Sequence, residues 1–212
     1  MIKILKTETY GLESAVRGMR NPMNSWDKSD SVFKMGYVSI GENDLALMKK
    51  LSAAGNDHAK YLRMINVTAD ITAPLYWWKE YDTYKVATVA NSTSTMHTIH
   101  KRDLTMDDFS HEHLSPLMKD HLIRTIDAMN AYRQMFVECG AKEFWWQIIQ
   151  TLPCSFNQKR TVQLNYQVLK NMYHSRKAHK LDEWREFCKW IEALPYFKEI
   201  CIDAVSKKED NA

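Results

Sequence analysis

Three side chains near the carboxyl end of the chain have types and a spacing that suit a ligand site. Asn165 and Arg176 fall in one predicted helix, about 20° apart in azimuth, on the side that carries Leu169 and Met172. A guanidinium on an apolar face needs an anionic or carbonyl partner, which a ligand can supply. Asn171 falls elsewhere on the wheel, so a single pocket has to wrap around the helix or include another subunit. The competing interpretation, in which Arg176 reaches the surface and both asparagines are exposed, stays open.

A tract of small polar side chains, 91–95, follows an apolar segment that contains Trp77 and Trp78. The tract has hydroxyl and amide groups and contains neither glycine nor proline. This pattern is typical of a solvated loop or of a polar cradle beside a ligand, and position alone does not decide between them.

Six basic residues are candidates for contacts to a ligand phosphate, because a nucleotide requires cations or backbone donors around its phosphates. For any one of them taken alone, a solvated surface position is the more common explanation. They are Arg17, Arg20, Lys79, Lys85, Lys159 and Arg160.

Other chemistry-bearing patterns are weak. The spacings of His97, His100, His111 and His113 match no tight ligand motif, so we expect no metal site. The sequence contains no GxGxxG, P-loop, GxSxG or HExxH motif. The tryptophan pairs 77–78 and 145–146 could stack on a planar ring, although such pairs are more typical of a core.

The composition predicts one ordinary globular domain with a full core. The chain has 212 residues, of which 45% are hydrophobic, and a net charge of +3, which is too low for a dedicated nucleic-acid binder. Four dispersed cysteines and the lack of a secretory leader favour reduced thiols in the cytoplasm. No apolar run approaches the roughly 18 residues that a membrane helix needs.

The elements that position these residues follow from hydrophobic periodicity. A helix that ends near Gly55 is expected to have Asn43 or Asp44 as its N-cap. We expect one helix-dominated α+β domain over 1–205, with a polar tail at 206–212. The expected strands are 1–10 and 65–72, and the expected helices are 12–20, 44–54, 115–139, 141–152 and 161–191, the last broken near 177–180.

The order of these features resembles the flavin-dependent thymidylate synthases. The segment "LESAVRGMR" is similar to the family's SAVRAAR-type segment, and "LALMKKLSAAGNDH" resembles its helix with a GH.E turn. The stretch "ITAPLYWWKEYDTYKVATVANSTS" resembles the strand and helix that lead into the signature RHRxxSxNExSxR. The segment "LPCSFNQKRTVQLNYQVLKNMYHSRKAH" resembles the family's C-terminal motif and keeps the spacing of Asn165, Asn171 and Arg176.

The resemblance implies a thymidylate synthase-complementing-like α+β fold, rich in helix with a small antiparallel sheet. It also implies a homotetramer with sites between subunits. The implied activity is reductive methylation of dUMP, or of a related pyrimidine nucleotide, with FAD as cofactor and with methylenetetrahydrofolate and NADPH as co-substrates. No protein nucleophile is needed, because the cofactor supplies the chemistry.

The resemblance also assigns roles to residues. Arg176 would be catalytic, holding the uracil and stabilising an enolate-like oxygen. Contacts to the cofactor are implied for Asn165, Asn171, Gln167, Lys85 and Thr88. Contacts to the substrate are implied for Asn91, Ser92, Ser94, Lys79 and Arg176.

The chain departs from the signature at its charged positions. Where RHR is expected, the chain has Tyr84-Lys85-Val86, or Thr83-Tyr84-Lys85 if no gap is allowed. Ser92 replaces the glutamate, and Met96 replaces the final arginine. Either Lys79, Lys85, Arg17 or Arg160 replaces the lost cations, or the ligand is different. The alternatives to an enzyme are a homologue that binds a nucleotide or nucleotide-derived signal without turnover, and a helical scaffold whose tryptophan pairs form an interface.

Overall fold

The computed structural model describes residues 1–204, so the predicted polar tail at 206–212 lies outside the described residues. The chain forms two compact units, and the prediction of a single domain over 1–205 stays a prediction. Unit 1 comprises Met1–Leu5, Asp70–Thr83 and Ala90–Thr161, and unit 2 comprises Lys6–Ala69, Tyr84–Val89 and the described residues from Val162 onward.

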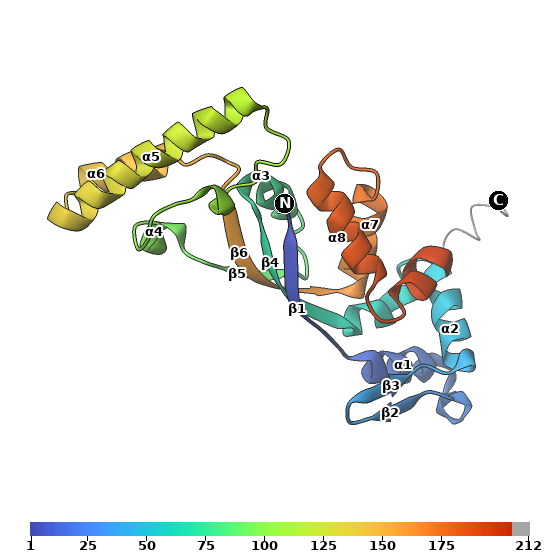
Figure 1. The fold of residues 1–212 in the computed structure, drawn as a ribbon. Helices are drawn as coiled ribbons and strands as arrows, with labels where there is room; N and C mark the ends of the chain where they lie inside the picture. The colour runs from blue at the N-terminus through green and yellow to red at the C-terminus, as the bar shows by residue number, and fades with distance from the viewer. Residues whose placement is uncertain (205–212) are drawn as a thin grey trace. The chain divides into compact units, whose positions relative to one another are not determined.

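A four-stranded sheet has the strand order β1-β4-β6-β5 (Figure 1). Its strands are β1 (Lys3–Tyr10), β4 (Asn66–Pro74), β6 (Asn157–Asn165) and β5 (Val89–Ser92). Strand β4 matches the prediction for 65–72, and its residues alternate between buried and half-buried positions. Two contacts show that β4 and β6 run antiparallel: the Tyr166 N–H donates to the Ile65 carbonyl, and the Thr161 hydroxyl donates to Asp70. The predicted helix-rich α+β fold with a small antiparallel sheet is confirmed.

The helix predicted from residue 161 was wrong at its start, because this region continues strand β6. Val162 and Leu164 are both 1% exposed, whereas Thr161 and Gln163 between them are exposed. This alternation is the period of a strand. Helix α7 (Tyr166–Arg176) follows directly, and α8 (Asp182–Glu192) begins after the predicted break.

Unit 1 contains a long helix, and the residues at its two ends explain where it begins and stops. The Ser115 hydroxyl accepts the Met118 N–H, Pro116 occupies the first helical position, and Gly140 ends the helix with φ 69°. This helix, α5 (Pro116–Cys139), lies beside α6 (Lys142–Thr151) as a helical hairpin (Figure 1). The other helical segments of the unit are α3 (Leu75–Tyr81), α4 (Thr95–Thr98) and the 3-10 turn η4 (Met106–Asp108).

The two tryptophan pairs of unit 1 differ in burial. Trp77 and Trp78 are at most 1% exposed and meet edge to face, with ring centroids 4.8 Å apart, as expected of a core pair. Trp146 is 43% exposed, so the second pair does not form a core.

Unit 2 contains short elements that the sequence did not predict. The β2–β3 hairpin, Val32–Lys34 paired with Tyr37–Ser39, lies between the two amino-terminal helices. The helix predicted to have Asn43 or Asp44 as its N-cap instead has Gly41 in that place. The helical segments here are α1 (Leu12–Arg20), the 3-10 turns η1 (Asn21–Met23) and η2 (Trp26–Lys28), α2 (Glu42–Ala53), η3 (Ala59–Met64) and the π-helix η5 (Lys198–Ile202).

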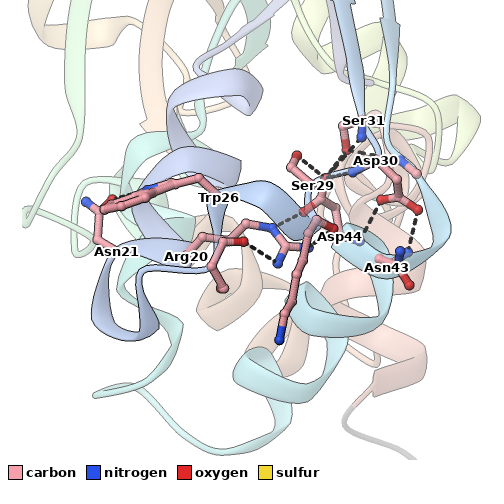
Figure 2. Close-up of polar contacts among 11 residues, drawn as sticks. Arg20, Asn21, Trp26, Ser29, Asp30, Ser31, Asn43 and Asp44 are labelled. Carbon is pink, nitrogen blue, oxygen red and sulfur yellow. Dashed lines mark hydrogen bonds and ion pairs between the residues drawn. The ribbon is translucent and has the colours of Figure 1, made fainter.

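A buried ion pair explains why the prediction for α2 was wrong (Figure 2). Asp44 is 0% exposed and accepts hydrogen bonds from the Arg20 guanidinium and from the hydroxyls of Ser29 and Ser31. The carboxylate of Asp30 accepts the backbone N–H groups of residues 43 and 44 and thereby caps the helix. The helix is therefore capped by a residue more than ten positions before its N-cap, and Asp44 instead binds residues of the preceding loop.

All four cysteines are free thiols; Cys188 and Cys201 are buried, and Cys139 and Cys154 are exposed. Burial raises the pKa of the Cys188 thiol to about 11 and that of Cys201 to about 12. Within residues 1–204, none of the helices has the length and apolarity that crossing a membrane requires.

Candidate functional site

Arg176, the residue singled out as catalytic, ends helix α7 in unit 2 and is held by aromatic groups. Its Nε donates a hydrogen bond of 2.9 Å to the Tyr84 hydroxyl. Its guanidinium carbon lies 4.8 Å from the ring centroid of Trp184 and 5.6 Å from that of Tyr84. These distances are within the range of cation–π attraction. The cation is thus fixed in position at the end of a helix.

Tyr84 belongs to a turn that also contains two predicted cofactor contacts. The Thr88 hydroxyl donates to the Tyr84 carbonyl at 2.5 Å, and Ala87 has a left-handed φ of 57°. Thr88 thus closes the turn with the hydroxyl that was predicted to contact FAD. Lys85 lies exposed on the same turn. The structure therefore brings Lys85, Thr88 and Arg176 together around Tyr84.

The other three predicted cofactor residues cluster at the start of α7. Asn165 is the N-cap, and its Oδ1 accepts the Val168 N–H at 3.0 Å. The amide nitrogen of Gln167 lies 3.3 Å from Oδ1 of both Asn171 and Asn56. Asn171, which the helical wheel placed apart, is thus linked to Gln167 by one helical turn.

Gln167 has a polar atom that the described residues leave without a partner. The side chain is 7% exposed, and its Oε1 is buried without a hydrogen bond. A buried acceptor without a donor costs about 1–3 kcal/mol. A donor supplied by a ligand would remove this cost.

The predicted substrate residues of the polar tract lie in unit 1. Asn91 and Ser92 are exposed on β5, and Ser94 is the N-cap of α4, where its carbonyl accepts the Thr98 hydroxyl at 2.7 Å. Strand β6 holds the tract, because the Thr93 N–H donates to the Lys159 carbonyl at 2.9 Å. The tract is therefore a fixed part of the sheet edge.

Lys79 is exposed in the last turn of α3.

Three of the six basic candidates have carboxylate partners inside the protein. Arg20 is paired with Asp44, which excludes it as a phosphate ligand. Lys159 lies 2.8 Å from Asp70. Arg160 lies 2.7 Å from Asp82 and stacks over the Trp78 ring at 4.2 Å. These cations are therefore poor replacements for the arginines missing from the signature.

Tyr84 and Trp184 contact Arg176, and the sequence reasoning gave neither of them a role at the candidate site. Tyr84 was noted only as a departure from RHR, and Trp184 was not singled out. The available signal was the coincidence of an aromatic residue with a signature position that normally carries a cation.

The comparisons with solved structures show the fold of this chain. Two crystal structures of thymidylate synthase X (ThyX) from Helicobacter pylori, both with FAD and dUMP, resemble this chain at 17% sequence identity. The TM-scores are 0.69 and 0.68, and the alignments cover 97% and 96% of this chain and 99% of each ThyX chain. No family model and no curated protein matches the sequence. The chain has the ThyX fold, so the resemblance found in the sequence is confirmed at the level of the fold.

Proposed function

We propose that this chain, built on the ThyX fold, is a flavin-dependent thymidylate synthase-like enzyme. Its reaction would be the reductive methylation of dUMP, or of a related pyrimidine nucleotide, with methylenetetrahydrofolate and NADPH. The structural neighbours contain FAD and dUMP, which supports these ligand classes. A fold alone does not fix an activity, so the proposal depends on the site.

The observation that carries the proposal is the placement of Arg176. C5 of a uracil becomes nucleophilic in an enolate-like form whose negative charge lies on a carbonyl oxygen, and a preorganised cation lowers the free energy of that form. The Tyr84 hydroxyl fixes the direction of the guanidinium, and the Trp184 ring supports its face. Arg176 would therefore bind the uracil oxygen and stabilise the charge formed there.

The residues near the start of α7 fit a flavin cofactor. The Oε1 of Gln167 lacks a donor, and flavin and adenine rings both carry N–H groups that could supply one. Lys85 offers an exposed cation for a phosphate. FAD, when bound and reduced by NADPH, would supply the hydride that converts the transferred methylene to a methyl group. Asn165 would act mainly by capping the helix that carries Asn171 and Arg176.

We also propose that the protein is a homo-oligomer, with a tetramer as the expected state. The support is a set of exposed apolar side chains along the α5–α6 hairpin, because such patches are typical of interfaces. A charged Trp146→Glu variant should lower the mass measured by light scattering, whereas Gln147→Glu on the same helix should not. A wild-type monomer would contradict the proposal. The exposed residues are Leu117, Met118, Ile123, Tyr132, Met135, Val137 and Trp146.

Two measurements on the purified protein test the enzymatic proposal. The first is flavin absorbance, before and after incubation with FAD. The second is dUMP-dependent release of tritium from C5 in the presence of methylenetetrahydrofolate and NADPH. A protein that takes up no FAD would be inconsistent with the proposal. Uptake of FAD without turnover would favour a nucleotide-binding homologue.

A further inference from the structure

A cavity of about 580 Å³ lies beside the polar tract, wholly within unit 1. Its wall includes Thr93 from the tract, Thr98 from α4, Thr72 from β4 and Asn157 from β6. The volume is within the range of about 300–1,000 Å³ that is typical of small-molecule sites. The tract therefore borders a space large enough for a nucleoside.

The charges in the wall of the cavity are largely neutralised by the protein. The guanidinium of Arg102 makes two hydrogen bonds with the Asp108 carboxylate, and Lys159 is paired with Asp70. Burial acts to raise the pKa of Asp108, but hydrogen bonds from Arg102 and Thr105 outweigh it and lower the pKa. Asp108 therefore stays ionised and keeps Arg102 engaged.

The two remaining charged residues of the wall, Lys101 and Asp107, have opposite signs. The cavity therefore offers no concentration of positive charge for a phosphate group.

The polar groups of the wall suit a ligand that both donates and accepts hydrogen bonds. The hydroxyls of Thr93 and Thr98 donate to the carbonyls of Lys159 and Ser94, so their oxygens can accept. Asn157 accepts the Ser110 hydroxyl with its Oδ1, so its amide nitrogen can donate. This mixture matches the amide-like edge of a heterocyclic base.

The floor of the cavity is apolar. Ile99 and Leu104 are 5% and 6% exposed and belong to the core of the unit. Phe156 packs against that core, with its ring centroid 5.7 Å from that of Phe109 in an edge-to-face contact. An apolar surface with a fixed aromatic ring favours a flat ligand.

We propose that this cavity binds an uncharged, flat heterocycle of nucleoside size and does not bind a phosphate group. Such a ligand has no phosphate group, so its binding does not depend on the charged signature residues that this chain lacks at Ser92 and Met96. The choice of a pyrimidine probe rests on the proposed function, whereas the preference for an uncharged ligand rests on the cavity alone.

The test measures the binding of deoxyuridine and of dUMP to the full chain by calorimetry. Wild type should bind deoxyuridine, and Thr98→Val should weaken both ligands by the same factor, about three- to tenfold, as expected for one hydrogen bond. Phe156→Leu should also weaken both ligands equally. Lys101→Met should leave the ratio of the two affinities unchanged. The matched control is Thr151→Val, because Thr151 is an exposed threonine outside the cavity whose hydroxyl also donates to a nearby carbonyl.

Three results would overturn the inference. The first is that wild type does not bind deoxyuridine at millimolar concentration, and the second is that neither Thr98→Val nor Phe156→Leu changes the affinity for the two ligands. The third is that Lys101→Met loses affinity for dUMP but not for deoxyuridine. Thermal unfolding of each variant shows whether it has folded. Flavin uptake and tritium release in the same preparations test the proposed function separately. Turnover of dUMP without binding of deoxyuridine would reject the inference alone, and binding of deoxyuridine without flavin uptake would reject the proposed function alone.

Discussion

Two arginines of unit 2, both on helices, differ in the groups that contact the guanidinium. Arg20 is 4% exposed, and its guanidinium donates to Asp44 and to the carbonyls of Ser25 and Lys28. Arg176 is half-buried and is held by the hydroxyl of Tyr84 and the ring of Trp184. Both side chains could be read from the sequence as ligand contacts. The contacts around the two cations differ: Arg20 is bound to a buried carboxylate, whereas Arg176 lies against aromatic groups.

The largest expected effect is the loss of stability when the pair of Arg20 and Asp44 is broken. Replacing Asp44 by alanine leaves the Arg20 guanidinium buried without its carboxylate, and breaking a buried pair costs about 3–5 kcal/mol. Urea denaturation should show this loss in the free energy of unfolding. Glu42→Ala, in the exposed first turn of the same helix, should change it by less than about 1 kcal/mol. Equal effects in the two variants would mean that the network contributes little.

The next largest effect is expected for Arg176, where a substitution should change turnover more than stability. Arg176→Ala should lower dUMP-dependent tritium release by about 10²–10³-fold, as for the removal of a preorganised group that stabilises a developing charge. The flavin should remain largely bound, and the free energy of unfolding should change less than in Asp44→Ala. Arg176→Lys keeps the charge but loses the stacked planar group, so we expect only partial recovery. Turnover at the wild-type rate in Arg176→Ala would remove this residue from the site.

A smaller effect is expected from Tyr84, which positions Arg176. Tyr84→Phe keeps the ring and removes one hydrogen bond, with an expected cost of about 1 kcal/mol, or roughly fivefold in turnover. The double variant Tyr84→Phe, Arg176→Ala should be no slower than Arg176→Ala, because the hydroxyl acts through the arginine. Tyr37→Phe, at an exposed position of strand β3, is the control. Additive losses in the double variant would show that Tyr84 acts independently.

The smallest effect is the pH dependence of the Asp44 contribution. Burial acts to raise the pKa of Asp44, but hydrogen bonds from Ser31, Ser29 and Arg20, with the charge of Arg20, outweigh it and lower the pKa. A lowered pKa stabilises the folded state. This stabilisation is fully present above the ordinary aspartate pKa of about 3.9, and it is lost as the pH falls through the pKa of the folded state. The difference in unfolding free energy between wild type and Asp44→Ala should therefore shrink below about pH 4. A constant difference from pH 7 to pH 3 would contradict this assignment.

Local patterns in the sequence were enough to predict the elements with local causes. Strand β4 has a period of two, and α5 has a serine cap, an initial proline and a terminal glycine. Strand β6 was misread because Leu164 also has helical spacing to Val168. The start of α2 was missed because its cap is Asp30, a residue outside the helix.

The residues of the candidate site also divide into those with a local signal in the sequence and those without one. Arg176 and the amides of α7 could be identified from one helix and one resemblance. Tyr84 could not, because its contact with Arg176 joins residues 92 positions apart in the sequence. Likewise, nothing in the sequence indicates that Lys159 and Arg160 are neutralised, since their carboxylate partners come from β4 and from the end of α3.

The Asp44 network has a consequence for amide hydrogen exchange. Asp30 and Ser31 lie outside any helix or strand, yet both of their backbone N–H groups donate to the buried carboxylate of Asp44. Exchange of these two protons requires the network around Asp44 to open. In deuterated solvent they should therefore persist as long as the amides of helix α2, which makes this segment slow to exchange despite its irregular backbone.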